Sequence, residues 1–303
     1  MLIEKTPASI CKCKFVSGGA TGWVYEAAPG IALKYCVRGR LDEFQVENET
    51  YDLIERSNPP PCFVLSFLRL PGINFMQMMA ESLDARLMRN QRRDFKQRIC
   101  LEVLRLEPTS KIEQWAVELA GALAWLESLG LVQGDLRPTN LLLDNDDHLK
   151  LADFDSAAKM GTRNPGLAPP WARLLGKEAG NLCGGFGLYG AKSEQFAFGS
   201  ILYNLTRGVE PYEDKGPEAV CLFRNMVFPE LSDSRLDILT LRCWRGDFAT
   251  LADLAQDVAL LDGAKWAATA TVTDDEYVGK MKETCQQLLQ DKFTDLDVES
   301  LAE

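Results

Sequence analysis

Three features are missing from this 303-residue sequence, and each absence excludes a class of protein. No apolar run approaches the roughly 18 residues of a membrane span, and the first residues contain no apolar signal core. The nine cysteines show no Cys-x-x-Cys spacing of a structural zinc site, which favours free thiols in a reducing compartment. We therefore expect a soluble intracellular protein, cytoplasmic or nuclear, that is neither secreted nor transmembrane.

Positive charge is also scarce. The chain has 33 Lys and Arg against 44 Asp and Glu, a net charge of −11. Binding nucleic acid through bulk charge needs clustered cations, so we expect no nucleic-acid partner, and no membrane partner either. With 46% hydrophobic and 25% charged residues, the composition is globular, and the length suits two domains or one fold with two lobes.

A glycine-rich turn lies near the N-terminus. Residues 14–36 alternate apolar and polar, which predicts two strands flanking the turn Ser17–Gly22. Gly18, Gly19 and Gly22 let backbone amides approach phosphate oxygens, because no Cβ is in the way. A plain hairpin turn is the other interpretation. A dinucleotide site is disfavoured, since a strand and not a helix follows.

Lys34 is an isolated cation in the apolar segment Ile31–Lys34. A buried ammonium needs a partner, and Glu47 on the helix predicted at 42–56 can supply it. The alternative is an edge-strand lysine whose charged head is solvated.

Further elements follow from periodicity and turn residues. The clearest helix covers residues 110–129, with Ser110 and Glu113 as a capping box and Gly130 at its end. The remaining segments are two short apolar runs, two short strands joined by a turn, and a long Gly- and Pro-rich loop: Cys62–Leu70, Ile73–Met79, Asn140–Leu143, His148–Ala152 and 156–191.

Polar residues gather just after the 110–129 helix. Asp135, Arg137 and Asn140 lie within six residues, and Asp153 follows 18 residues after Asp135. Magnesium takes oxygen ligands, usually one or two carboxylates with phosphate and water. Asn140 and Asp153 suit that task, which leaves Asp135 to orient or deprotonate a hydroxyl.

The order of these pieces resembles the eukaryotic protein kinase family, and several segments are similar to divergent kinases of filamentous fungi. The matching motifs are SGGATGWV, IALK, Glu47, QGDLRPTN, DFD, Ser193–Gly199, Gly208–Tyr212 and Cys243-Trp244. The resemblance implies an α+β, two-lobed fold. Residues 1–79 would form a small β-rich N-lobe with one main helix, residues 80–261 a larger, mainly helical C-lobe, and residues 262–303 an acidic tail.

The resemblance also implies a role for each matching residue. The glycine loop would cover the phosphates of ATP, and Lys34, paired with Glu47, would hold the α- and β-phosphates. Asp135 would be the catalytic base, with Arg137 near the γ-phosphate. Asn140 and Asp153 would hold Mg²⁺. The remaining nucleotide contacts, including the gatekeeper and hinge, would come from Ser17, Gly18, Gly19, Gly22, Val24, Ala32, Met76, Gln77, Met78, Met79 and Leu142.

Several residues depart from the family pattern. Gln133 replaces the usual His, which alters a contact beneath the D-F-x motif, and Asp155 replaces a hinge glycine. Gly134 replaces the Arg that would bind a phosphorylated activation loop, so we expect activity independent of that phosphorylation. Glu194 replaces a bracing Asp. Residues 168–170 are the candidate for a degenerate A-P-E, but no glutamate follows them, so the sequence leaves the position of that motif open.

The function expected from this set is phosphoryl transfer from Mg-ATP to Ser or Thr of a protein. The alternatives are a nucleotide-binding pseudokinase scaffold and a small-molecule phosphotransferase of kinase-like fold. The sequence leaves the protein substrate and the oligomeric state open.

Three other features are interpreted structurally. Residues 86–105 carry seven cations against Asp94 and Glu102, which indicates a solvated helix face or, alternatively, a site for an acidic substrate. His148, the one histidine, is interpreted as a turn residue. The cluster Met76-x-Met78-Met79 is assigned to core and hinge.

Overall fold

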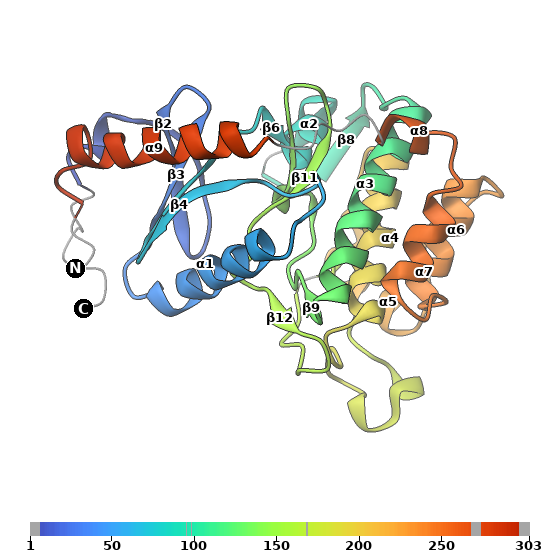
Figure 1. Cartoon of the computed structure of the whole chain (residues 1–303). Coiled ribbons are helices and arrows are strands. Elements are labelled where there is room, and N and C mark those ends of the chain that lie inside the picture. The colour runs from blue at the N-terminus through green and yellow to red at the C-terminus, as the bar shows by residue number, and fades with distance from the viewer. Residues whose placement is uncertain (1–6, 95, 98, 168, 268–273, 297–303) are drawn as a thin grey trace. The chain divides into compact units, whose positions relative to one another are not determined.

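The structure, a computed structural model, describes residues 7–94, 96–97, 99–167, 169–267 and 274–296. The chain divides into two compact units, one of Met1–Met79, Asp153–Ser156 and Thr271–Glu303, the other of Ala80–Ala152 and Ala157–Ala270 (Figure 1). The first unit is rich in strands and the second in helices, as the predicted fold class requires. Among the described residues, no helix is both long enough and apolar enough to cross a bilayer.

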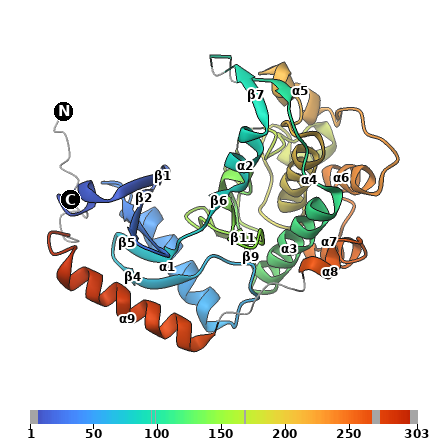
Figure 2. The same cartoon turned by 90° about the horizontal axis from the view of Figure 1, so that it is seen from above.

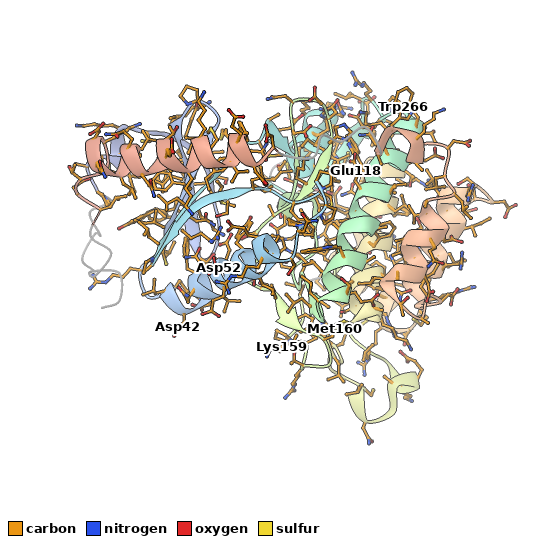
Figure 3. All side chains as sticks on the ribbon, in the orientation of Figure 1. Asp42, Asp52, Glu118, Lys159, Met160 and Trp266 are labelled. Atoms are coloured by element: carbon orange, nitrogen blue, oxygen red, sulfur yellow. The ribbon has the colours of Figure 1, made fainter. Side chains whose placement is uncertain are left out.

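The first unit is built on an antiparallel five-stranded sheet. Its strands, in spatial order, are β1 (Lys14–Gly18), β2 (Gly22–Ala28), β3 (Ile31–Cys36), β5 (Ile73–Gln77) and β4 (Ser66–Leu70). Helix α1 (Leu41–Arg56) confirms the predicted 42–56 helix, and its polar residues include Asp42 and Asp52 (Figure 3). Because β3 is central and all six of its residues are buried, the edge-strand interpretation of Lys34 is wrong.

A C-terminal helix completes this unit. Residues 262–303 were predicted only as an acidic tail, but α9 (Asp275–Asp291) runs along the sheet and packs on β4 (Figures 1 and 2). Cys285 and Phe293 are buried with Leu33 and Phe75 in one hydrophobic cluster. Side chains alternate between the two faces of a strand. The covering by α9 therefore explains why β3 is buried on the face opposite to Lys34.

The second unit is mainly helical. The helices are α2 (Leu83–Arg89), α3 (Thr109–Ser128), α4 (Ala191–Arg207), α5 (Glu218–Arg224), α6 (Arg235–Arg245), α7 (Leu251–Val258) and α8 (Ala264–Ala267). Short strands pair between them: β6 (Glu81–Ser82) with β10 (Leu141–Leu143), β10 with β11 (Leu149–Leu151), β9 (Leu131–Val132) with β12 (Ala158–Lys159), and β7 (Gln91–Asp94) with β8 (Ile99–Val103). The 3-10 segments of this unit are η2 (Pro138–Asn140), η3 (Lys177–Leu182) and η4 (Glu213–Lys215), and the first unit contains η1 (Ile10–Lys12).

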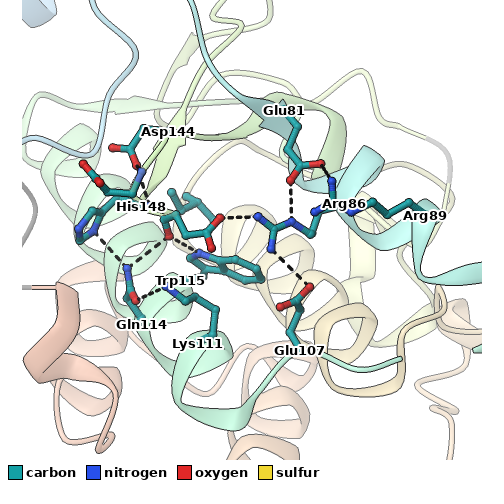
Figure 4. A network of polar contacts seen from close by, with 12 residues as sticks. Glu81, Arg86, Arg89, Glu107, Lys111, Gln114, Trp115, Asp144 and His148 are labelled. Carbon is teal, nitrogen blue, oxygen red and sulfur yellow. Dashed lines mark hydrogen bonds and ion pairs between the residues drawn. The ribbon is translucent and has the colours of Figure 1, made fainter. Parts of the chain in front are cut away.

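The predicted helix face at 86–105 is wrong, because α2 ends at Arg89 and a β-hairpin follows. Arg86 turns inward: its Nε is 2.6 Å from Glu81 Oε1, and Glu107 and Asp147 also bind its guanidinium (Figure 4). Arg93 binds Glu213 at 2.5 Å. These two cations are thus only partly exposed and paired with carboxylates, which a helix face open to solvent would not allow.

The predicted capping box of the 110–129 helix is also wrong. α3 begins at Thr109 after Pro108, without a side-chain cap, and Glu113 Oε2 instead accepts from the Gly263 N–H (2.8 Å). Ser110 lies inside the first turn, so its hydroxyl is not at the capping position. Gly130, with φ of 73°, follows the helix end as predicted.

His148 lies in the turn before β11, as predicted, but it is buried. Its Nδ1 is 2.5 Å from Glu118 Oε1 on α3, and Gln114 Nε2 is 3.1 Å from the same nitrogen (Figure 4). The Trp115 indole N–H donates to the Asp147 carbonyl (2.9 Å). These contacts fix the turn between β10 and β11 against α3, directly after the catalytic segment predicted from the sequence.

Candidate functional site

Lys34 is the centre of a buried charge cluster in the first unit. Its Nζ is 2.6 Å from Glu47 Oε2 on α1 and 2.6 Å from Asp153 Oδ1. Burial alone would lower the pKa of Lys34, but the two carboxylates outweigh it and hold that pKa above its ordinary value. The sequence predicted the pairing with Glu47. It did not indicate that Asp153, 119 residues away, binds the same ammonium.

The glycine-rich turn packs directly over Lys34. A Cβ on Gly22 would lie 3.0 Å from two carbons of the Lys34 side chain and 3.2 Å from the Tyr35 carbonyl oxygen, so only glycine fits without a shift. Ser17 and Gly18 end β1, and the Gly19 N–H donates to the Gly22 carbonyl (2.9 Å). The turn therefore closes on itself beside the buried ammonium.

The D-F-x segment is anchored on both sides of its phenylalanine. Asp153 has a φ of 59°, a left-handed conformation that aspartate tolerates better than most residues. Phe154 is fully buried, with its ring 5.2 Å from that of Tyr51 and 6.1 Å from that of Phe63. Asp155 accepts a hydrogen bond from Thr21 Oγ1 (2.7 Å), which ties the segment to the glycine-rich turn. No local sequence pattern indicated the Thr21 contact.

The residues expected to surround adenine are in both units. In the first, Val24 pairs with Lys34 across β2 and β3, and Ala32 pairs with Met76 across β3 and β5. Gln77 ends β5, and the Met78 N–H donates to the Gly30 carbonyl (3.0 Å) before the unit's segment ends at Met79. Leu142, on β10, belongs to the second unit.

The catalytic loop predicted at 133–140 is tightly bonded in the second unit. Asp135 Oδ2 is 3.0 Å from the Arg137 guanidinium and 3.1 Å from Asn140 Nδ2, which also donates to the Asp135 carbonyl (2.8 Å). The structure thus brings these three predicted residues together.

Gln133, which stands where the family has His, makes hydrogen bonds in two directions. Its side chain is fully buried; Oε1 accepts from the Asp135 N–H (2.8 Å) and Nε2 donates to the Ala152 carbonyl (3.3 Å). An amide has both a donor and an acceptor, so it can bridge the two segments. Gln133 therefore connects the catalytic loop to the residue before Asp153.

Glu194, on α4, accepts hydrogen bonds from the backbone of the loop predicted to be catalytic (133–140). Its Oε2 accepts from the Gln133 N–H (3.2 Å), and the Gly134 N–H also bonds to this side chain. Gly134 has a φ of 84°, so the backbone here is in the region that favours glycine. Burial, with a smaller contribution from the Asp135 charge, raises the pKa of Glu194 to about 7.

This raised pKa predicts a pH-dependent stability. The folded state keeps the Glu194 proton between the ordinary carboxyl pKa and about 7, so stability falls as pH rises through that window. Glu194→Gln keeps an acceptor for the Gln133 N–H and cannot ionise. The variant should gain on the wild type as pH rises, by up to about 3 kcal/mol. Denaturant unfolding followed by tryptophan fluorescence measures this, and a difference that is constant with pH would contradict it.

The long loop after the D-F-x segment is held by its own backbone. The Tyr189 N–H donates to the Thr162 carbonyl (2.9 Å) and the Asn164 N–H to the Gly187 carbonyl (3.0 Å). Of the residues proposed to mimic A-P-E, position 168 lies outside the described residues, while the Pro170 carbonyl accepts from Ser200 Oγ (2.6 Å). The independence from phosphorylation stays a prediction.

Comparisons with known proteins agree with the motif set. The family model of the protein kinase domain matches residues 75–232, just over half of the chain. Putative CBL-interacting protein kinase 27 of Oryza sativa subsp. japonica is 36% identical over 110 residues, which are 36% of this chain and 27% of that protein. Rho-associated protein kinase 1 of Homo sapiens is 34% identical over 107 residues, 33% of this chain and 8% of that protein. The matches thus span less than a third of the length of these relatives. With more than half of its residues matched by the family model, the chain belongs to the protein kinase family.

Proposed function

We propose that this protein transfers the γ-phosphoryl group of Mg-ATP to Ser or Thr hydroxyls of a protein substrate. The observation that carries the proposal is the buried Lys34, held at 2.6 Å by both Glu47 and Asp153 in the central strand of its sheet. Burying a charged group costs free energy, and a structural role alone does not explain why a cation is buried beneath a glycine-rich turn. We also propose an intracellular location, cytoplasmic or nuclear, which the absence of Cys-x-x-Cys spacing among the nine cysteines of the sequence supports.

Each residue of the site has a proposed task. Lys34 binds the α- and β-phosphates, with Glu47 orienting its ammonium, and the backbone amides of the glycine-rich turn contact phosphate oxygens. Asp135 orients the substrate hydroxyl and accepts its proton. Arg137 lies 3.0 Å from Asp135 and stabilises negative charge on the transferring phosphoryl group.

The polar side chains fit a magnesium ion. Asn140 uses its amide nitrogen to bind Asp135, and its side-chain oxygen, which accepts only a long hydrogen bond from Thr139 (3.4 Å), is the atom that can turn to a cation. Asp153 adds a carboxylate, and magnesium usually takes only one or two carboxylates from the protein. When bound, the ion neutralises phosphate charge. We propose Asn140 and Asp153 as its two protein ligands.

The metal assignment predicts a magnesium-dependent stabilisation by ATP. In the wild type, ATP should raise the melting temperature more with magnesium than with EDTA, because ligands that bind the folded state stabilise it. Asp153→Asn should lose this difference. Asp42→Asn, at an exposed position on α1, is the matched control. Equal ATP-induced shifts with EDTA and with magnesium in the wild type would argue against the assignment.

A pseudokinase scaffold is the second candidate, and one contact favours it. Asp155 replaces the glycine of the motif and binds Thr21, so it restrains the glycine-rich turn and adds a negative charge beside the proposed phosphate site. An assay with radiolabelled Mg-ATP and generic protein substrates separates the candidates. Transfer to Ser or Thr supports the kinase, and nucleotide binding without transfer supports the scaffold. Transfer only to small molecules would support the phosphotransferase alternative.

A further inference from the structure

A mostly apolar cavity of about 400 Å³ lies within the second unit, beneath the loop that precedes α4. Its walls include Leu167, Trp171, Leu175, Phe186, Phe196 and Trp244. This volume is within the range of small-molecule sites, which are concave and lined chiefly by hydrophobic and aromatic side chains. The proposed phosphoryl transfer does not use this cavity.

The outer wall of the cavity is well ordered by hydrogen bonds. The Leu175 N–H donates to the Gly185 carbonyl (2.8 Å), and the Gly184 N–H donates back to the Leu175 carbonyl (2.9 Å). The Phe186 ring lies so close to the Gly166 backbone that a Cβ at Gly166 would clash with it. Hydrogen bonds and close packing therefore hold this loop in a defined conformation at the cavity.

Among the described residues, some of the cations at the cavity form an ion pair with a carboxylate and others do not. Arg173 is paired with Glu178 at 2.6 Å. Lys192 and Arg245 are exposed, and within the described part of the chain neither has an ion pair. The Lys192 side chain lies against Gly246: a Cβ added at Gly246 would be 3.6 Å from Lys192 Cγ. Lys192 is therefore close to the residue that follows Arg245 in the chain. Two uncompensated cations thus share the rim.

The cations that line the cavity outnumber its acids: Arg173, Lys192 and Arg245 stand against Glu178 and Glu194. Glu194 is buried and accepts a backbone hydrogen bond from the Gln133 N–H (3.2 Å). The rim is therefore net positive, although the chain as a whole carries −11. An apolar interior with cations at its mouth favours a molecule with an apolar body and one negative end.

We propose that this cavity binds a small amphipathic carboxylate, with its apolar part among Trp171, Phe186 and Trp244 and its carboxylate at Lys192 and Arg245. Arginine is suited to carboxylates because its planar fork can donate two parallel hydrogen bonds. Gly134 and Leu136, on either side of Asp135, also line the cavity, so an occupant contacts the loop proposed to be catalytic. Binding is measured directly, so its outcome is independent of the proposed transfer activity.

The test is calorimetric titration of the full chain with decanoate below its micelle concentration. We expect saturable binding to one site. Acetate, decan-1-ol and decyltrimethylammonium should each bind at least about tenfold more weakly, because each lacks the apolar tail or the negative charge; a factor of ten corresponds to about 1.4 kcal/mol. Decanoate that does not bind, or that binds no better than the alcohol or the cation, would overturn the proposal.

Variants locate the site. Lys192→Ala with Arg245→Ala should weaken decanoate binding about tenfold or more, whereas Lys280→Ala with Lys282→Ala, two exposed cations on α9, should leave it unchanged. Leu182→Trp adds a ring at a half-exposed position on the cavity wall and should compete with the ligand. Circular dichroism checks that each variant is folded. Unchanged affinity in both cavity variants would show that decanoate binds elsewhere.

Discussion

Asp135→Asn should reduce phosphoryl transfer by about 10²- to 10⁴-fold while leaving nucleotide affinity nearly unchanged. The carboxylate is proposed to accept the proton of the substrate hydroxyl, and an amide cannot do so. The geometry should survive, because an amide oxygen can still accept from Arg137 and Asn140, which now bind Asp135 Oδ2. Since Asp135 is not proposed as a phosphate ligand, nucleotide binding has no reason to fall.

The measurement is label transfer from radioactive Mg-ATP, with nucleotide affinity determined separately by calorimetry. Asp146→Asn, at an exposed turn position of the same unit, is the control and should keep full activity. An Asp135→Asn protein as active as the wild type would refute the assigned base. An inactive wild type that binds nucleotide would instead identify a pseudokinase.

Phe293→Ala should destabilise the first unit by about 3–5 kcal/mol, the range for removing a buried aromatic side chain. Phe293 is 2% exposed, and its ring centroid lies 5.9 Å from that of Phe75 on β5. This segment is held in place by two further contacts: Lys292 donates to the Ala27 carbonyl (2.7 Å), and Asp295 accepts from the Ser9 N–H (3.1 Å). The loss is large relative to the 5–15 kcal/mol of a typical domain.

Hydrogen exchange resolved by peptide is the appropriate measurement, because a chain of two units need not unfold in one step. Peptides from β3, β4 and β5 should lose protection in Phe293→Ala, and peptides from α3 and α4 should not. Gln286→Ala on the exposed face of α9 is the control. Equal loss of protection in both units, or no loss, would contradict the assignment of this segment to the sheet.

Local patterns were sufficient to predict several elements of each unit. The alternation at 14–36 gave the strands around the glycine-rich turn, and the apolar periodicity at 110–129 gave α3. Both patterns depend on residues only two to four positions apart, so they can be recognised from the sequence without knowing the fold. The hairpin at 91–103 was missed because its many arginines were interpreted as exposed.

The sequence by itself determined which residues can carry chemistry: an isolated lysine in an apolar strand, and an acid, a cation and an amide within six residues. Tertiary structure decided what those residues contact. Asp153 reaches Lys34 across 119 positions, and Gln133 bridges Asp135 to Ala152. It also made α9 the cover of the sheet, which buries the face of β3 opposite to Lys34. Such contacts form between segments that are distant in the sequence. A local pattern of charge or hydrophobicity does not show which distant residue a buried side chain will contact.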